Sequence, residues 1–387
     1  MSERSVGFDA ARIQVLEGLE AIRKRPGMYV GSTGERGLHE LVFNVADRPV
    51  NEVLAGRVGS VDVTLTHDGG VRIADDGPGL PFESEAAGRP GLEVQLTRTH
   101  PGTEPGGRHG VTLDLYGMGL GVTNALSSRL TAEVQGEGTH WIQEYARGVA
   151  VTRLTAVGPA TGSGTTIAFL ADPDIFGTAE FSFETLAKRF RELAFLNREL
   201  DITLTDERPP GPSRSERFRS PGGARDFVDF LNAQGGAPVH PDTIGFERED
   251  PRMAGTLEVA LQWYGSDEKQ VLSFANSRPT PGGGTHLVGF RDGLTTAVNT
   301  YARTQRLLTA ADPDLSADRL GEGLTAVVSV KLDHPEFLGS TSGVLGNATV
   351  RPCVAQAVQE HLSNWLETHP EQAATVLGLI VSGSRRD

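Results

Sequence analysis

One stretch, Gly37 to Gly56, constrains the fold more than any other part of the chain. Its apolar residues recur three or four positions apart, which predicts a helix with one buried face. The opposite, polar face is expected to carry four side chains, namely Asn44, Asp47, Arg48 and Asn51. Pro49 stands inside this helix, and because proline interrupts helical hydrogen bonding we expect a kink that re-aims the polar face.

The composition excludes several classes of protein. Hydrophobic residues make up 38% of the 387 residues and charged residues 22%, as in an ordinary globular protein long enough for two domains. A single cysteine, Cys353, leaves no internal disulfide and no cysteine-cluster metal site. The net charge of −14 argues against DNA as a partner. Because it lacks an apolar signal core and any run of about 18 apolar residues, the sequence predicts a cytoplasmic protein with no membrane partner.

Four short motifs accompany the helix. AIRKRPGMYVGST precedes it at 21–33, ADDGPGLP follows at 74–81, and TNALS and GGTHL stand further on at 123–127 and 283–287. Together they resemble the ATPase region of the DNA gyrase B proteins, members of the GHKL family. The resemblance covers nearly the whole chain. It implies an α+β protein, with a GHKL (Bergerat) ATPase-type α/β sandwich followed by a ribosomal S5 domain 2-like transducer domain.

The resemblance also divides the chain into three parts. Residues 1–20 match an arm through which family members dimerise, residues 21–215 the ATPase-like domain, and residues 216–387 the transducer-like domain. The boundary falls in PPGPSRSERFRSPGG (209–223), which is rich in proline, serine, glycine and arginine.

Local patterns predict several elements of these domains. Apolar and polar residues alternate on both sides of an Asp-Gly-Gly turn within residues 61–77, which indicates a β-hairpin. Amphipathic spacing predicts helices over 183–197 and 351–369. Three other segments read as strands or strand ends, namely 257–265, 283–290 and 324–332.

Three residues match the adenine-binding positions of the family. There, the aspartate at the position of Asp75 accepts a hydrogen bond from the adenine amino group, Gly79 lets the base approach, and Thr165 supports the aspartate. Taken alone, Asp75 also suits an Asx turn. Gly117 and Gly119 match the loop that cradles the phosphates through backbone N–H groups.

The residues that family members use for catalysis are altered. The glutamate that activates water is replaced by Asn44, and the asparagine that holds Mg²⁺ by Arg48. An amide takes no proton at neutral pH, and a guanidinium repels a cation. We therefore expect no metal ligand, no Mg²⁺ and no required cofactor, while binding of ATP or ADP stays open.

Other phosphate contacts are altered as well. The family's lid lysine matches Glu104, its cradle glycine and histidine match Asp114 and Tyr116, and its transducer lysine matches Ser342. Phosphoryl transfer depends on positioning and charge neutralisation, so these changes together predict no meaningful ATP hydrolysis.

Three functions follow from the sequence. The first is a homodimeric pseudo-ATPase that binds a nucleotide or another small molecule in the former ATP pocket. The second is an enzyme with ATP- and Mg²⁺-independent chemistry in that pocket, an isomerisation or cyclisation as in natural-product biosynthesis. Its hypothetical catalytic residues are Tyr116, Asp114, Arg48 and Asn44, and the alternative is a dead pocket closed by an ion pair such as Arg48 with Asp114. The third is a genuine topoisomerase ATPase fragment.

Overall fold

The computed structural model describes residues 18–80, 91–98, 110–111, 113, 119–208, 211–233, 237–265, 269–339 and 343–383. The described residues of the first half form a nine-stranded sheet. Its order runs through β5 (Val149–Ala150), β4 (Thr139–Ala146), β3 (Ser127–Gly136), β7 (Gly164–Ala171), β2 (Val71–Asp75), β1 (Val61–Leu65), β8 (Ile202–Asp206) and β9 (Arg214–Phe218), and β6 (Thr155–Pro159) pairs with β4. The predicted hairpin is confirmed as the antiparallel pair of β1 and β2.

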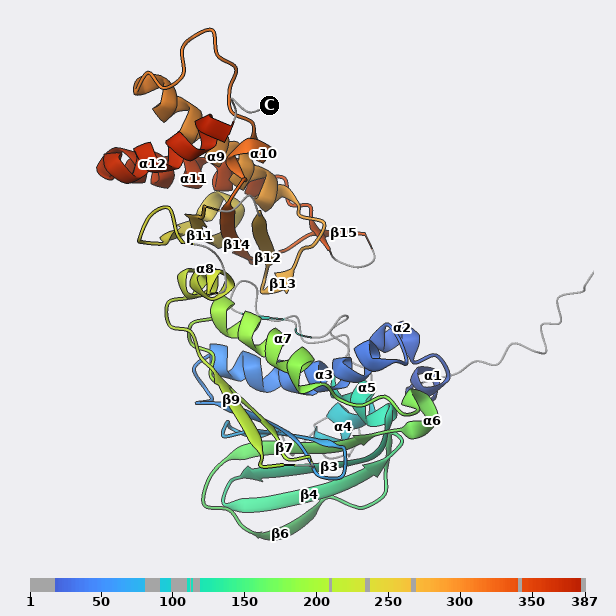
Figure 1. The fold of residues 1–387 in the computed structure, drawn as a ribbon. Helices are drawn as coiled ribbons and strands as arrows, with labels where there is room; N and C mark the ends of the chain where they lie inside the picture. Colours follow the sequence, from blue (N-terminus) through green and yellow to red (C-terminus); the bar gives the residue numbers. More distant parts are fainter. Residues whose placement is uncertain are drawn as a thin grey trace, which may run out of the picture.

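Helices cover one face of this sheet (Figure 1). The two longest are α3 (Glu35–Leu54) and α7 (Phe183–Leu196). Shorter helices lie near the ends of the strands: α1 (Leu19–Lys24), α2 (Gly27–Val30), α4 (Gly91–Thr97), α5 (Leu120–Ala125) and α6 (Pro173–Phe176). The apolar side chains of α3 and of β1 and β2 share one core, because the periodic face of the helix lies against the inward face of the hairpin.

Pro49 does not interrupt α3. The helix runs without a break over 20 residues, with Pro49 buried inside it. The helix therefore continues past the proline, whereas the expected kink that re-aims the polar face stays a prediction. The packed core holds the helix together although Pro49 lacks the N–H that would bond to the carbonyl of Val45.

The second half is built on a five-stranded sheet of described residues. Its order is β10 (Ile244–Asp250), β11 (Gly255–Trp263), β14 (Leu324–Leu332), β12 (Gln270–Ala275) and β13 (Arg278–Pro279), with a separate pair of β15 (Phe337–Leu338) and β16 (Val344–Leu345). The helical elements are α8 (Ala224–Asn232), η3 (Pro251–Met253), α9 (Thr285–Thr304), α10 (Ala317–Leu320), α11 (Val350–Thr368) and α12 (Pro370–Gly383). The first and third segments read as strands, 257–265 and 324–332, are confirmed as β11 and β14, and the helix over 351–369 as α11.

Two local readings of the sequence are corrected. Residues 285–290 form the first turns of α9, with Gly284 as its N-cap, and of the segment read as a strand or strand end only Gly284 makes an isolated β-bridge, with Leu345. The three glycines before Thr285 lie against residues 343–345, because Gly282 donates to the carbonyl of Gly343 and Gly283 accepts from the N–H of Leu345. Within the stretch that composition marks as a boundary, residues 214–218 form β9, which pairs with β8 of the first sheet.

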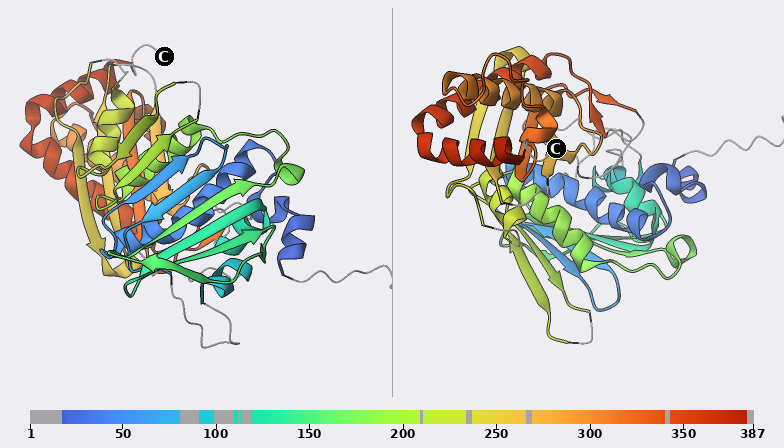
Figure 2. Two further views of the ribbon diagram at one scale, coloured as in Figure 1. Left: turned by 90° about the horizontal axis from the view of Figure 1, so that it is seen from below. Right: turned by 45° about the horizontal axis from the view of Figure 1, so that its top comes forward.

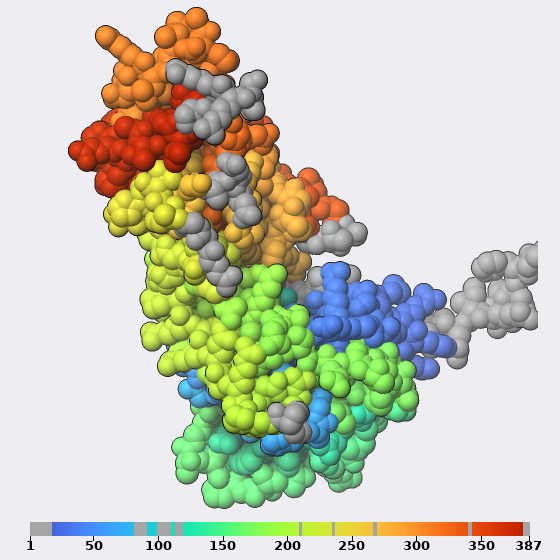
Figure 3. Space-filling view, in the orientation of Figure 1, coloured from blue at the N-terminus to red at the C-terminus, as the bar shows by residue number. Residues whose placement is uncertain are grey.

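Helix α8 joins the two halves. Its Phe227 and Val228 share a core cluster with Phe195 of α7 and Phe274 of β12. Figures 2 and 3 show this junction, where the yellow segments lie between the green part of the first half and the orange part of the second. The fold is thus α+β, as the sequence predicts.

Candidate functional site

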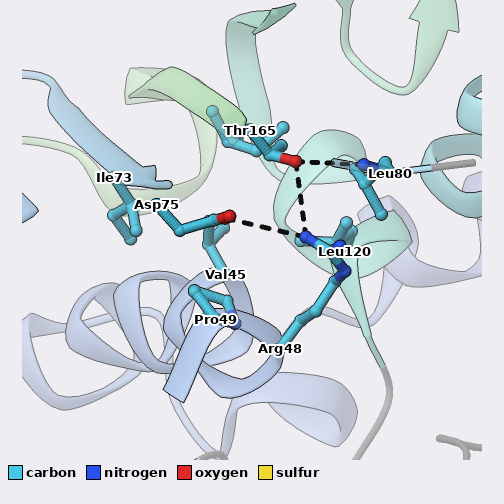
Figure 4. A pocket seen from close by; sticks show the side chains of 9 residues that line it. Val45, Arg48, Pro49, Ile73, Asp75, Leu80, Leu120 and Thr165 are labelled. Atoms are coloured by element: carbon cyan, nitrogen blue, oxygen red, sulfur yellow. Dashed lines mark hydrogen bonds and ion pairs between the residues drawn. The ribbon is translucent and has the colours of Figure 1, made fainter. Parts of the chain in front are cut away.

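A cavity lies between α3 and the ends of β2 and β7, and Figure 4 shows it from close by. Its volume is about 240 Å³, counting the space that is open to solvent. Nine residues line it: Val45, Arg48, Pro49, Ile73, Asp75, Leu80, Leu120, Thr165 and Ile167. Two of them carry a charge, and they belong to opposite walls.

The side chain of Arg48 reaches from α3 across this cavity. Its Nη2 donates to the carbonyl oxygen of Gly79 at 2.9 Å, and its Nη1 donates to Thr165 Oγ1 at 3.4 Å. The same Nη1 lies 3.6 Å from Asp75 Oδ2, which makes an ion pair (Figure 4). Arg48 thus contacts all three residues that the resemblance assigns to adenine recognition.

Asp75 ends β2 directly opposite Thr165 of β7, so the sheet register brings the two side chains together. Its side chain is only 3% exposed, and its Oδ1 accepts a hydrogen bond from the backbone N–H of Gly77 at 3.0 Å. Burial raises the pKa of the Asp75 carboxyl above its usual value, and the Arg48 charge opposes this only in part.

Gly79 and Thr165 shape the turn beside the cavity. Gly79 has φ of +82°, and a Cβ there would lie 2.9 Å from Val134 Cγ1, so only glycine fits this position. Thr165 Oγ1 accepts a hydrogen bond from the N–H of Leu80 at 3.1 Å. Thr165 therefore stabilises the turn after Asp75 and also accepts a hydrogen bond from Arg48.

Asn44 lies one turn before Arg48 and is buried. Its Nδ2 donates to the backbone carbonyl of Glu40 in the same helix at 2.9 Å. Its Oδ1 is buried and has no hydrogen-bond donor among the described residues. The amide is thus held against its own helix, and it offers no group that could take a proton from water.

Two further polar residues of α3 have a role that the sequence did not reveal. Asp47 Oδ1 accepts from the N–H of Leu113 at 2.7 Å. Asn51 accepts from the N–H of Val111 at 2.8 Å and donates to its carbonyl at 2.7 Å. Both side chains therefore anchor the segment that leads to the expected phosphate loop. Their place on the polar face was the available signal, but their partners depend on the tertiary fold.

Several predicted site residues lie outside the described residues: Asp114, Tyr116, Gly117, Glu104 and Ser342. Gly119 is described, with φ of +74° at the N-cap of α5. Among the described residues Arg48 pairs with Asp75, and the ion pair of Arg48 with Asp114 stays a prediction. Glu52, near the end of α3, pairs with Arg57.

The residues around the cavity do not fit the ligands that the resemblance implies. The acceptors expected to face an adenine already bind Arg48, whose side chain reaches across the cavity. A guanidinium at the expected Mg²⁺ position cannot ligate a cation. In the part of the chain that the structure describes, no cluster of three or more His, Cys, Asp or Glu side chains could hold a metal ion. None of the described helices is long and apolar enough to cross a membrane.

Comparisons with known proteins agree with the fold. A family model described as DNA gyrase B matches residues 223–387. The DNA gyrase B protein of Streptomyces coelicolor is 46% identical over 97% of this chain, and the novobiocin-resistant gyrase B protein of Streptomyces niveus is 45% identical over 96%. The chain spans 57% of the length of each of these relatives.

Solved structures give the same result. The 43K ATPase domain of Thermus thermophilus gyrase B, determined with an aminocoumarin, superposes with a TM-score of 0.78 at 33% identity, over 94% of both chains. The gyrase B protein of Myxococcus xanthus gives a TM-score of 0.75 at 26% identity, over 93% of this chain and 99% of that one.

Proposed function

The chain belongs to the DNA gyrase B family, and on that premise we propose that it is a gyrase B-like protein that does not hydrolyse ATP. One observation carries the proposal. Arg48 occupies the position where the family has a Mg²⁺ ligand, and it is bound to Asp75, Gly79 and Thr165. A cationic side chain at this place excludes the metal and fills the base pocket at once.

The absence of a general base is a second argument against ATP hydrolysis. A positioned general base contributes about 10²–10⁴-fold to the rate of a proton-transfer step. Asn44 cannot supply it, because its amide nitrogen is a donor and is bonded to the carbonyl of Glu40. Even a nucleotide bound elsewhere in the cleft would find no proton acceptor at this position.

The arrangement gives less support to a repurposed enzyme. Acid–base chemistry with Asp114 and Tyr116 would use Arg48 as the partner that holds a substrate. Arg48 instead faces Asp75 on the opposite wall. We therefore place the pseudo-ATPase first, and propose a small molecule in the former ATP pocket as its ligand only where that ligand leaves Arg48 in place.

Two structural statements belong to the same proposal. Because β9 completes the first sheet, we place the boundary between the ATPase-like and transducer-like domains after Phe218. Following the family, the arm of residues 1–20 joins two chains in a homodimer. Light scattering of the purified protein should give twice the mass of one chain, and a single-chain mass at high protein concentration would contradict the dimer.

The test of the proposed function is release of phosphate from Mg-ATP under steady-state conditions. The wild-type chain should release no more phosphate than an Asn44→Ala variant purified in the same way, since neither carries a base. Release that scales with wild-type protein, needs Mg²⁺ and falls in Asn44→Ala would overturn the proposal.

A further inference from the structure

We propose that Asn51 and Asp47 form a clamp that docks the chain at Val111 and Leu113 onto α3 without the help of a bound ligand. Neither clamp residue lines the cavity that contains Arg48, so the clamp is a separate device on the polar face of the helix. The docked segment leads into the expected phosphate loop, which should therefore begin at the same place with and without a nucleotide. The clamp does not depend on whether the protein hydrolyses ATP.

The side-chain amide of Asn51 pairs with Val111 as a neighbouring β-strand would. Its Oδ1 accepts from the N–H of Val111 at 2.8 Å, and its Nδ2 donates to the carbonyl oxygen of Val111 at 2.7 Å. Two residues in a hydrogen-bonded pair of an antiparallel sheet exchange both of their bonds in the same way. An amide offers a donor and an acceptor, whereas a carboxylate only accepts. The pairing therefore requires the amide of asparagine.

Contacts within α3 orient the two side chains of the clamp. Asn51 Nδ2 also donates to the backbone carbonyl of Asp47, one turn earlier, at 2.7 Å, so both of its N–H groups are used. Asp47 Oδ1 accepts from the N–H of Leu113 at 2.7 Å, and a bond to a charged acceptor is stronger than one between neutral groups. The helix thus supplies every partner of the docked backbone groups, and no ligand group is needed to complete the set.

Burial adds to the stability of the docked position. Val111 is 2% exposed and Leu113 is 6% exposed, and both side chains belong to the same core cluster as the apolar face of α3. Backbone N–H and C=O groups beside such a core are costly when they lack partners. The clamp supplies these partners, so apolar packing and hydrogen bonding favour the same position of the chain.

The second half contains the same arrangement at Asn299 of α9. Its Nδ2 donates to the carbonyl of Thr295, one turn earlier, at 3.0 Å and to the carbonyl of Leu315 at 3.0 Å, and its Oδ1 accepts from the N–H of Leu315 at 2.8 Å. Asn299 does not line the candidate cavity. A helical asparagine therefore docks a crossing segment there with no contribution from the candidate site, which makes Asn299 the matched control for Asn51.

Amide hydrogen exchange of the wild-type protein, with no nucleotide, with ADP and with a non-hydrolysable ATP analogue, tests the clamp. The N–H groups of Val111 and Leu113 should be protected in the protein without nucleotide, because each donates to a side chain of α3. Neither nucleotide should change their exchange rates. Fast exchange that slows only when a nucleotide is added would overturn the inference, because the ligand would then dock the segment.

Asn51→Asp keeps the shape of the side chain but removes the donor and places a carboxylate against the carbonyl of Val111. Exchange at Val111 and Leu113 should become at least about tenfold faster, while Leu315 stays protected. Asn299→Asp should show the reverse pattern. Wild-type exchange rates in Asn51→Asp, or the same change at both places in either variant, would contradict the clamp. If Asn51→Asp does not fold, the comparison of the wild type with and without nucleotide still decides.

Discussion

His286 is a buried imidazole whose protonation is coupled to folding. It has no exposed surface, and its Nε2 lies 3.0 Å from Thr280 Oγ1, while its Nδ1 has no partner among the described residues. Burial lowers the pKa of His286 from 6.5 to about 4. The folded protein therefore keeps this ring neutral in a pH range where the unfolded chain binds a proton.

This coupling predicts a specific loss of stability in mild acid. Because the folded pKa is lower than the unfolded one, the stability is lost as the pH falls from about 6.5 towards 4. Between pH 7 and pH 5 the wild type should lose about 2 kcal/mol more than His286→Gln in urea unfolding. His67→Gln, at an exposed turn, is the matched control. An identical pH dependence of wild type and His286→Gln would contradict the prediction.

At the candidate site, the chemical character of each residue could be predicted from the sequence, but the contacts of its side chain could not. That Asn44 offers no base and Arg48 no metal ligand follows from their chemistry alone. The partner of Arg48 does not, because it depends on how α3 faces β2 across the core.

At the level of the secondary structure elements, the backbones of α9 and α11 approach each other closely, because glycines of α9 lie at the contact. A Cβ on Gly293 would lie 2.5 Å from the carbonyl oxygen of Ala355, and one on Gly289 would lie 2.5 Å from that of Arg351. Close backbone approach, rather than flexibility, explains these two glycines inside a helix.

Substitution of Gly293 by alanine should therefore destabilise the protein although alanine favours helices. Overpacking of this kind lowers the free energy of unfolding by about 1–3 kcal/mol. Gly378→Ala on α12 is the matched control, because a Cβ there meets no atom within 4 Å. It should stabilise the protein by about 0.5–1 kcal/mol in the same denaturation experiment. Equal effects of the two substitutions would show that the helices are not in close contact at Gly293.

A second prediction concerns the hydrogen bond that α3 lacks because of Pro49. Because the proline leaves the carbonyl of Val45 without its helical partner, Pro49→Ala should raise the free energy of unfolding, by up to about 3 kcal/mol. Pro173→Ala is the control, because Pro173 stands in the first turn of α6, where proline costs no hydrogen bond. A gain in Pro173→Ala as large as that in Pro49→Ala would contradict this explanation.

The elements that the sequence predicted are those with a clear period. The β1–β2 hairpin, α7 and α11 each carry an uninterrupted pattern. The start of α9 was misread because glycines hide its period, and β9 because its polar residues lie at the edge of the sheet. The continuity of α3 through Pro49 does not follow from a local rule, because it depends on the packing around the helix.

At the scale of the whole molecule, aromatic rings join the two halves. Phe227 of α8 stacks on Phe195 of α7, with 4.6 Å between ring centroids, and lies 5.9 Å from Phe274 of β12. Polar contacts accompany them: Lys331 Nζ donates to Asn197 Oδ1 at 3.0 Å, and Arg189 donates to the carbonyl of Ser277 at 3.2 Å. We expect the halves to unfold together for this reason.

Phe227→Ala should weaken that coupling. Loss of a buried phenylalanine costs about 3–5 kcal/mol. Because Trp263 and Trp365 lie in the second half and Trp141 in the first, tryptophan fluorescence and circular dichroism should then give separate unfolding midpoints. Phe230→Ala, with a ring that is 47% exposed on the same helix, should keep coincident midpoints. Coincident midpoints in Phe227→Ala would mean that the aromatic contact does not couple the halves.

A single-turnover experiment is the most sensitive test of whether this gyrase B-like chain hydrolyses ATP. Wild-type protein in excess over labelled Mg-ATP reveals even one cleavage per chain, and slow release of products cannot hide it. We expect the label to stay in ATP at the rate of a protein-free control, because Asn44 supplies no base and Arg48 occupies the pocket. Mg²⁺-dependent conversion to ADP above that control would contradict the proposed function.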